Sequence, residues 1–452
     1  MVLGLLFPNA LWLLSFITTS EINTLHGMDA DTIKRVREDI KDCGNPHVHL
    51  NAAGDSPMPG CVLQKYQEVL AREALVGGYV AASEYRGEFE QTRKSAARLI
   101  NADAAEIALV DSATTAWFRA FYSVNLSPGD VVLTSLTEYA GNYVAMLQHT
   151  RRYGASIQCL ENDSKGVVDV KKLETVISKI GSRVKAICIT HVPTNGGVIN
   201  PVVSIGRVAS EHNILYILDS CQAVGQLAID VKQIGCDFLA ATGRKYLRGP
   251  RGSGFLYARA EVMLEMGEKG SIRLQEPPTL DHYAAPIKQT EDGCISYSMH
   301  ANARRFEQWE SNYAGLVALG TAIEYALQLG MGEIESRIVY LARKFRERLN
   351  AISGIKIMDL GDNSSQCGIV TFVVNGISPK TIKDHMQANH NVYIHTSSML
   401  SSPLDGAMRI LPKDGLVRAS VTYFNTEKEI EFVAKSLHNF IEQNGTDVGD
   451  VK

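Results

Sequence analysis

The sequence predicts an α/β protein in which a large domain with a doubly wound, mostly parallel sheet precedes a smaller α+β domain. Three observations lead to this prediction. Apolar runs of strand length alternate with helical patterns from about residue 87 onward. Several of these runs are continuously apolar, as expected for parallel strands that helices cover on both faces. After about residue 325 the pattern changes, and strands outnumber the helices among them.

The predicted large domain spans residues 65–324, and its elements follow one another in the order expected for this fold. Strands are expected at 106–112, 130–135, 185–192, 214–220, 236–242 and 252–259. Helices are expected at 87–101, 114–126 and 200–213, and one long helix at 303–330.

The predicted small domain spans residues 325–452. Its strands are expected at 355–360, 368–374, 392–396 and 416–423, and its helices at 379–390 and 427–444. An amphipathic helix at 29–43 lies in the segment 28–64 ahead of the large domain. We expect this segment to pack with the small domain.

The first 27 residues form an apolar extension ahead of these domains. The run from Val2 to Ile17 is apolar, but no basic residue precedes it, and Pro8 and Asn9 interrupt it. Both features are unlike a signal peptide, and the run is short for a membrane span. We therefore expect a cytoplasmic protein without a membrane partner, with a signal or an anchor as the alternative.

Composition and charge exclude other classes of protein. The 452 residues are 45% apolar and 21% charged, and a formal net charge of −4 gives no electrostatic footprint for nucleic acid. The eight cysteines are scattered, and none forms a C-x-x-C pair. We therefore predict no zinc or other metal site and interpret the cysteines as free thiols in a reducing compartment.

Polar residues follow the predicted strands, at the edge where open α/β sheets bind ligands. Thr114 and Thr115 begin a predicted helix, where free N–H groups and hydroxyls can bind an anion. Tyr139 follows the next strand and offers a flat ring to an aromatic ligand. Taken alone, each feature is better explained as a helix N-cap or a packed core tyrosine.

Two later segments are more specific. Asp219 ends a fully apolar strand, and a buried acid is unfavourable without a cationic partner. Gln222 follows three residues later. Lys245 stands in "ATGRKYLRGP", close to Thr242 and Arg244. A lysine on such a loop, beside a hydroxyl and a guanidinium, indicates a covalent role next to an anionic group.

Together these residues fit one ligand, pyridoxal 5′-phosphate (PLP), which combines a cationic ring, an aldehyde and a phosphate. We predict that Asp219 holds the protonated ring nitrogen, that Tyr139 stacks on the ring and that Gln222 reaches the ring hydroxyl. Lys245 would bind the aldehyde covalently. The predicted phosphate ligands are Thr114, Thr115, Thr242 and Arg244. A dinucleotide-dependent oxidoreductase would need a G-x-G-x-x-G turn, which the sequence lacks.

The order and spacing of these segments resemble the class V aminotransferase family, in its cysteine desulfurase-like branch, from about His49 to Asn439. The segments that carry the resemblance are "HLNAAGDSPMP", "DSATTAW", "TEYAGN", "HVPTNGGVINPV", "LDSCQAVGQLAIDV", "DFLAATGRKYLRGPRGSGFLY", "RRFEQWESNYAG" and "RASVTYFNT". The resemblance implies fold type I of the PLP-dependent enzymes and a homodimer in which two subunits build each site. Within the family, the chain is similar to lyase- or cyclase-like members, including those of fungal secondary metabolism.

The chain departs from the family pattern at several positions. Leu400 stands near the place of the nucleophilic cysteine of desulfurases, and no cysteine follows Cys367. Because persulfide formation needs a thiolate, this departure argues against desulfurase chemistry. Tyr139 and Arg244 stand where relatives have histidines.

Two further family contacts do not transfer directly. The family's asparagine is displaced by one position, so Thr194 and Asn195 compete for its role, and Asn195 is the predicted cofactor ligand. A threonine that relatives lend to the phosphate of the neighbouring subunit aligns near Glu310 or Ser311. Glutamate is a poor phosphate ligand, and this contact is left unassigned.

The resemblance also implies how a substrate is bound. Arg418 aligns with the arginine that binds an α-carboxylate, which a guanidinium can hold bidentately. The implied substrate-binding residues are Ala53, Asn142, Leu400 and Arg418. Lys245, once displaced by the substrate amine, is the natural base at the α carbon.

The residues leave the later steps of the reaction open. Elimination at the β carbon (including C–S cleavage), ring closure, epimerisation and transamination all begin in the same way. We expect a lyase or a cyclase, with an aminotransferase or an epimerase as the alternative. A non-catalytic protein is least expected, because Lys245 and Asp219 are both present.

Overall fold

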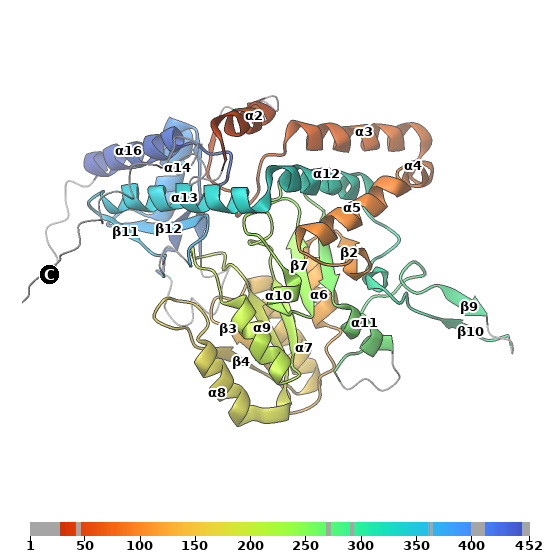
Figure 1. Ribbon diagram of the computed structural model, residues 1–452. Helices are drawn as coiled ribbons and strands as arrows, with labels where there is room; N and C mark the ends of the chain where they lie inside the picture. The colour runs from red at the N-terminus through yellow and green to blue at the C-terminus, as the bar shows by residue number, and fades with distance from the viewer. Residues whose placement is uncertain are drawn as a thin grey trace, which may run out of the picture.

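The computed structural model describes residues 28–41, 47–267, 273–289, 293–359, 361, 365–398 and 412–444. Two sheets organise these residues (Figure 1). A seven-stranded sheet has the strand order β2-β8-β7-β6-β5-β3-β4, and a four-stranded sheet has the order β11-β12-β15-β14. The predicted α/β class with a large, mostly parallel sheet is confirmed.

The strands of the large sheet are short and mostly parallel. They are β2 (Ile107–Val110), β3 (Val131–Ser135), β4 (Ser156–Leu160), β5 (Val184–Thr190), β6 (Leu215–Asp219), β7 (Phe238–Thr242) and β8 (Gly254–Ala258). Strands β3 to β7 pair in parallel, whereas β8 runs antiparallel to both β2 and β7. The order reverses beside β3, because β4 lies on one side of it and β5 on the other. Such a reversal leaves a crevice at the carboxyl ends of the strands.

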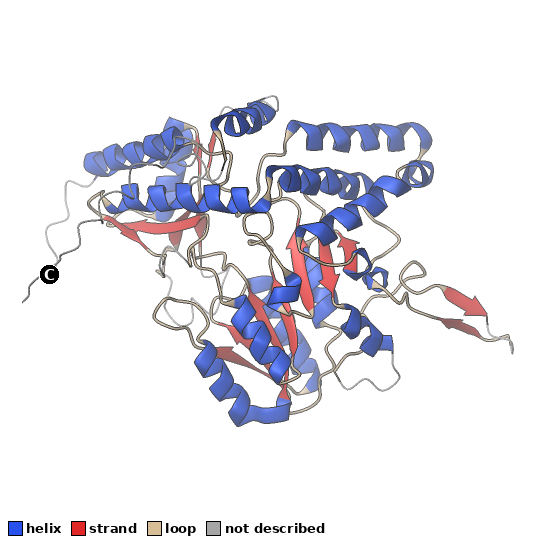
Figure 2. Ribbon diagram, viewed as in Figure 1, coloured by secondary structure: helices blue, strands red, loops and turns tan. Residues whose placement is uncertain are grey.

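Helices cover both faces of this sheet, as Figure 2 shows. The helices of this part of the chain are α3 (Gly60–Val76), α4 (Gly78–Glu84), α5 (Arg86–Leu99), α6 (Ala113–Phe121), α7 (Ala140–Tyr153), α8 (Val170–Ile180), α9 (Val202–Glu211), α10 (Val231–Ile234), α11 (Ala260–Gly267) and α12 (Tyr313–Leu329), with 3₁₀ turns η1 (Ala104–Glu106), η2 (Gly181–Arg183) and η3 (Ala303–Phe306). Of these, α3 packs on α12 and α4 rather than on the sheet. Along β6, Leu215 and Ile217 belong to one apolar cluster, and Tyr216 and Leu218 to another. The two clusters explain why these strands are apolar at every position.

The long helix expected at 303–330 begins ten residues later than predicted, at Tyr313. Residues Ala303–Phe306 form the turn η3 instead. The Asn312 side chain accepts a hydrogen bond from the Gly315 backbone N–H at 2.8 Å and caps α12. This local cap stops the helix from extending towards its N-terminus, although the apolar pattern continues.

The second sheet contains β11 (Ile355–Ile357), β12 (Ile369–Val374), β14 (His395–Ser397) and β15 (Leu416–Ser420). Three helices accompany it: α13 (Met331–Asn350), α14 (Pro379–His390) and α16 (Glu427–Asn444). The strand expected at 392–396 is divided into two. Strand β13 (Val392–Tyr393) pairs with a segment near the start of the described chain, whereas β14 pairs with β15.

The segment at the start of the described chain contacts the C-terminal part. Its helix α2 (Ala30–Lys41) is followed by β1 (Val48–His49), which pairs in parallel with β13. The Ser420 backbone N–H also donates to the Leu50 carbonyl at 2.7 Å. The boundary predicted at residues 324–325 falls inside α12, and the domain limits stay a prediction.

Several elements have no counterpart in the sequence prediction, among them the helices α3, α7 and α13. Others are β4, α8 and a hairpin of β9 (Ile287–Gln289) and β10 (Ile295–Tyr297), which projects from the body of the protein in Figure 1. The hairpin side chains Ile287, Ile295 and Tyr297 are exposed.

Among the described helices, no single one is long and apolar enough to cross a membrane. The adjacent helices α12 and α13 meet the criteria of length and composition only together, and they are bent by 79° relative to each other. The apolar extension 1–27 lies outside the described residues.

Candidate active site

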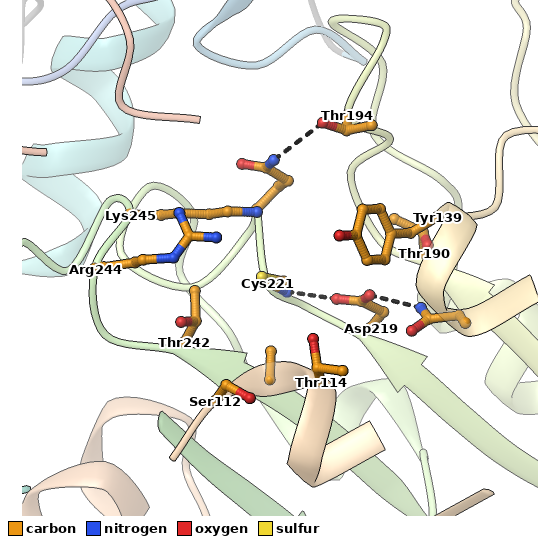
Figure 3. A pocket seen from close by; sticks show the side chains of 13 residues that line it. Ser112, Thr114, Tyr139, Thr190, Thr194, Asp219, Cys221, Thr242, Arg244 and Lys245 are labelled. Atoms are coloured by element: carbon orange, nitrogen blue, oxygen red, sulfur yellow. Dashed lines mark hydrogen bonds between the residues drawn. The ribbon is translucent and has the colours of Figure 1, made fainter. Parts of the chain in front are cut away.

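A pocket opens at the carboxyl ends of β5, β6 and β7, beside the reversal of strand order (Figure 3). Its walls also include the first turns of α6 and α7. The lining residues are Ser112, Ala113, Thr114, Tyr139, Asn142, Thr190, Thr194, Asp219, Cys221, Gln222, Thr242, Arg244 and Lys245. Most of the residues predicted from the sequence therefore come together in one place.

Lys245 lies on a closed loop that follows β7. The Gly243 N–H donates to the Ser253 carbonyl at 2.9 Å, and the Gly249 N–H donates to the Gly243 carbonyl at 2.8 Å. The Lys245 side chain is buried, with 9% of its surface exposed. These bonds hold the loop, and with it the lysine, in a fixed position at the pocket wall.

Arg244 connects the lysine loop to the segment after β1. Its guanidinium donates to the Gly54 carbonyl, and the Ser56 N–H donates to the Arg244 carbonyl at 2.9 Å. Arg244 is a predicted phosphate ligand, and one donor of its guanidinium is therefore already bonded to the protein backbone. Arg244 also lines the pocket, and Figure 3 shows its side chain beside that of Lys245.

Asp219 is the last residue of β6 and is buried. Its Oδ1 accepts from the Cys221 backbone N–H at 2.9 Å, and its Oδ2 accepts from Asn142 Nδ2 at 2.7 Å. Burial raises the pKa of Asp219, and hydrogen bonds and the neighbouring Lys245 oppose this rise. A cationic group in the pocket would complete the environment of this carboxylate.

The first turn of α6 forms the opposite end of the pocket. Ser112 caps the helix, because its Oγ accepts from the Thr115 N–H at 3.1 Å. Thr114 lines the pocket, whereas Thr115 does not, although its hydroxyl lies 3.2 Å from Ser112 Oγ. A Cβ on Gly254 would lie 2.5 Å from the Ala241 carbonyl oxygen, so glycine is needed there for β8 to pack beneath this turn.

Tyr139 precedes α7 and presents its ring to the pocket (Figure 3). The side chain is 41% exposed, so the ring has room for a stacking partner. Gln222 lies deeper, and its Nε2 donates to the Ala53 carbonyl at 3.1 Å. Its buried Oε1 has no hydrogen-bond partner among the described residues. An unpaired buried acceptor at a pocket wall is suited to a ligand hydroxyl.

Arg418, on β15 of the second sheet, does not line the pocket but contacts Thr194, which does. Its Nη1 donates to Thr194 Oγ1 at 2.7 Å and to the Thr194 carbonyl at 3.2 Å. Burial lowers the pKa of Arg418 to about 10, which leaves it cationic at neutral pH. Its buried Nε has no hydrogen-bond partner within the described part of the chain. A buried cation with a free donor is suited to an anionic ligand.

The structure distinguishes between some of the predicted residues. Of the two candidates left open, Thr194 lines the pocket and Asn195 does not. Asn142 lines it as well, but its amide nitrogen donates to Asp219 and Glu138. Leu400 lies outside the described residues.

Four lining residues were not predicted from the sequence: Ser112, Ala113, Thr190 and Cys221. Thr190 is the last residue of β5, and this position at the carboxyl end of a strand could have marked it as a pocket residue in the sequence. Cys221 follows Asp219 by two residues. Burial raises the pKa of its thiol, and the nearby Lys245 ammonium opposes the rise.

These groups fit the predicted cofactor. The pocket offers a lysine, a buried carboxylate, an aromatic ring, an unpaired amide oxygen and, at the far end, a helix start with hydroxyls. The fold and this pocket define a PLP-dependent enzyme of fold type I.

The comparisons with known proteins identify the family. The chain belongs to the class V aminotransferase family, whose model (Aminotransferase class-V) matches residues 48–433. It is 27% identical over 394 residues to a probable cysteine desulfurase of Methanothermobacter thermautotrophicus, covering 86% of this chain and 94% of the relative. It is 29% identical over 405 residues to a probable cysteine desulfurase of Xylella fastidiosa, covering 87% and 91%.

Solved structures share the fold. The apo structure of a cysteine desulfurase from Thermococcus onnurineus NA1 matches with a TM-score of 0.79 and 23% identity over 91% of this chain and 98% of that one. A complex between the cystine C-S lyase C-DES and cysteine persulfide matches with a TM-score of 0.75 and 20% identity, covering 87% and 98%.

Proposed function

We propose that this PLP-dependent enzyme acts at the α carbon of an amino acid, as a lyase (C–S or another β-elimination) or a cyclase. The observation that carries the proposal is the arrangement of Lys245 and Asp219 in one pocket, with Arg418 next to it through Thr194. When bound, PLP withdraws electrons from the α carbon of an amino acid.

Each residue has a defined role in this proposal. Lys245 binds the cofactor covalently and later takes the proton from the α carbon. Asp219 pairs with the ring nitrogen, Tyr139 stacks on the ring, and Gln222 accepts from the ring hydroxyl through its unpaired Oε1. The proposed phosphate ligands are Thr114, Thr115, Thr242 and Arg244, and Asn195 remains a further proposed cofactor ligand.

Arg418 is the proposed ligand of the substrate carboxylate. Its bond to Thr194 orients the guanidinium, and its buried Nε remains available to the substrate. A desolvated guanidinium binds a carboxylate strongly because the two form parallel charged hydrogen bonds. Ala53, Asn142 and Leu400 complete the proposed substrate site.

The thiols of the chain favour elimination over sulfur transfer. Cys367 is the last cysteine of the sequence. It is buried, and burial raises the pKa of its thiol to about 11. Burial raises the pKa of Cys221 as well. Because a thiol, not a thiolate, prevails at both positions, neither is suited to attack sulfur on a substrate.

A panel of amino acids tests the reaction class. Purified enzyme is incubated with each amino acid, and products are identified by mass spectrometry. We expect pyruvate with release of the β substituent, or a cyclised product. A keto acid that keeps its β substituent would indicate the alternative aminotransferase, and racemised substrate would indicate an epimerase. A protein-bound persulfide would contradict the proposal.

We further propose a cytoplasmic homodimer. The buried cysteines Cys188, Cys236 and Cys367 are free thiols, as expected in a reducing compartment. Exposed apolar side chains on α3, on α4 and before α12 support the dimer.

A further inference from the structure

A second buried carboxyl lies behind Asp219. Glu138 is in the connection between β3 and α7 and is fully buried. A single side chain connects the two acids: Asn142 Nδ2 donates to Glu138 Oε1 at 2.9 Å and to Asp219 Oδ2 at 2.7 Å. The position of the Asp219 carboxylate therefore depends on Glu138 through one amide group.

Glu138 is itself held by several elements. Its Oε1 also accepts from Thr190 Oγ1 at 2.6 Å and from the Tyr139 N–H at 2.9 Å. Its Oε2 lies 3.2 Å from the Thr134 hydroxyl. A hydroxyl donates to a carboxylate and accepts from a carboxylic acid, so Thr134 can pair with either form of Glu138. The network therefore permits a proton on Oε2 without breaking any of the bonds to Oε1.

The titratable groups that face Glu138 favour the acid form. Asp219 faces it from β6, Cys188 from β5 and Cys159 from β4. Burial raises the pKa values of both thiols, so they are neutral at physiological pH. Two ionised carboxyls joined by one neutral amide repel each other in a desolvated site. Burial, followed by the charge of Asp219, raises the pKa of Glu138 to about 7.

We propose that Glu138 is a positioning residue that exchanges a proton at Oε2 and, through Asn142, controls the charge that Asp219 presents to the pocket. When Glu138 is protonated, Asp219 carries the only one of the two carboxyl charges at this wall of the pocket. As a carboxylate, Glu138 adds a second charge behind Asp219 and strengthens the hold of the wall on a cationic ligand atom. This inference rests on the proposed pairing of Asp219 with the ring nitrogen.

The central variant is Glu138→Gln. Its amide keeps an acceptor for Asn142 and a donor for Thr134, and so copies the protonated acid. We expect the holoenzyme of this variant to bind PLP within about threefold of wild type, which is less than 1 kcal/mol. We also expect its visible absorbance to lose a transition that wild type shows near pH 7.

An infrared measurement on the cofactor-free protein tests the proton directly. Wild type should show a protonated-carboxyl band that fades as the pH rises through about 7 and that is absent from Glu138→Gln. The matched control is Glu106→Gln, a buried carboxyl that accepts from the Ala260 N–H at 2.9 Å outside this network. The band and the absorbance transition should persist in that control.

A second variant keeps the test valid if Glu138→Gln does not fold. Thr190→Val removes one donor to Glu138 and keeps a β-branched residue at the end of β5. With less stabilisation of the carboxylate, both transitions should move to higher pH, by on the order of one unit. A shift to lower pH, or no shift, would contradict the proposal.

Two results would overturn the inference. In the first, wild type and Glu138→Gln show the same pH dependence and no difference in the infrared band. In the second, Glu138→Gln loses PLP as completely as Glu138→Ala, a variant that removes the whole carboxyl group. That result would mean that PLP binding requires the ionised form of Glu138. Asp219→Asn separates these results from failure of the proposed function: if it binds PLP with an unchanged spectrum, the Asp219 pairing is wrong, while the infrared test of Glu138 still stands.

Discussion

Lys245 owes its proposed role to the loop that follows β7. The loop is closed by hydrogen bonds, and the side chain is buried beside Asp219 and Cys221. We predict that Lys245→Ala still binds PLP through the remaining pocket residues but loses the covalent link. Borohydride reduction of wild type followed by peptide mapping should locate the attachment at Lys245. Labelling of another lysine would refute this assignment.

Arg418 should govern binding of the amino acid rather than of the cofactor. Loss of a charged, desolvated hydrogen-bonded pair costs about 2–5 kcal/mol, or roughly thirtyfold or more in affinity. Arg418→Ala should therefore weaken substrate binding and leave bound PLP intact, and Arg418→Lys should recover only part of the loss. The measurement is exchange of the α hydrogen for deuterium as a function of substrate concentration. Exchange by Arg418→Ala as fast as wild type at low substrate would contradict the carboxylate role.

Glu138 should also make the stability of the cofactor-free protein depend on pH. Its pKa is about 7 in the folded protein and 4.5 in the reference state, because burial and then Asp219 raise it. Between these two pKa values only the folded protein holds the proton. The stabilisation that this proton gives the folded state is therefore complete below about pH 4.5 and is lost as the pH rises through 7. Glu138→Gln lacks this titration.

The free energy of unfolding of Glu138→Gln, compared with that of wild type, should therefore increase by about 2–4 kcal/mol as the pH is raised from about 5 to about 8. Urea unfolding at several pH values measures the difference. The same series on Glu106→Gln controls for removal of a buried carboxyl elsewhere. A constant difference between Glu138→Gln and wild type across this range would show that Glu138 does not change its proton on folding.

Single residues differ in how far the sequence predicts them. The placement of Lys245 and Asp219 in one pocket was predictable because Asp219 ends an apolar strand and Lys245 follows the end of the next one by three residues, at the edge where parallel sheets gather their ligands. The choice between Thr194 and Asn195 depended on which side chain turns inward, and no local pattern contains that information. The contact of Asn142 with Glu138 and Asp219 joins three segments and follows only from their packing.

At the level of elements, a buried ion pair holds the loop that carries Thr194. Asp359 Oδ1 accepts from the Gly197 N–H at 3.1 Å, and Oδ2 accepts from Arg346 Nε at 2.9 Å. Arg346 Nη2 also donates to the Ile369 carbonyl at 2.6 Å, at the start of β12. The second sheet thereby fixes the loop of the large sheet to which Arg418 is bonded.

We predict that Asp359→Asn destabilises the protein by about 3–5 kcal/mol, because it leaves the Arg346 charge buried and uncompensated. Substrate binding should weaken as well, since the Thr194 loop loses an anchor. Chemical denaturation and substrate titration measure the two effects. The control is Asp384→Asn, which removes an exposed pair with Lys380 and should leave the midpoint unchanged. An unchanged midpoint for Asp359→Asn would show that the pair does not hold the loop.

The limits of elements were harder to predict than their existence. The helix α16 begins at the predicted residue, Glu427, because acidic residues stand in its first turn and its apolar spacing is regular. The start of α12 was wrong by ten residues, because the apolar pattern continues through η3 while the Asn312 cap ends the helix locally. Strand β4 was missed because its residues alternate between exposed and partly buried at an edge of the sheet.

At the level of the whole molecule, the alternation of strands and helices was sufficient to predict the class of fold. The antiparallel direction of β8 and the pairing of β1 with β13 were not predictable, because both depend on contacts between distant segments. The number of subunits likewise depends on surfaces rather than on periodicity. Exposed apolar side chains indicate where two subunits would associate.

These side chains gather over α3, α4 and the segment before α12. Leu75, Tyr79, Val80 and Trp309 are exposed, and the rings of Tyr79 and Trp309 lie 5.9 Å apart. Trp309 precedes Glu310 and Ser311, and with Tyr79 these residues line a cavity in this face. Exposed aromatic side chains that lie next to each other, such as Tyr79 and Trp309, are typical of a protein interface.

We therefore predict that light scattering shows a dimer and that the double variant Tyr79→Glu/Trp309→Glu dissociates into monomers. Charges at two central aromatic positions would be desolvated and unpaired in the interface, which opposes association. The matched control is Phe432→Glu, which adds a charge at an exposed aromatic residue on α16, outside this face. The control should remain dimeric. A fully active wild-type monomer would rule out the dimer, and a double variant that stays dimeric would place the interface on another surface of the protein.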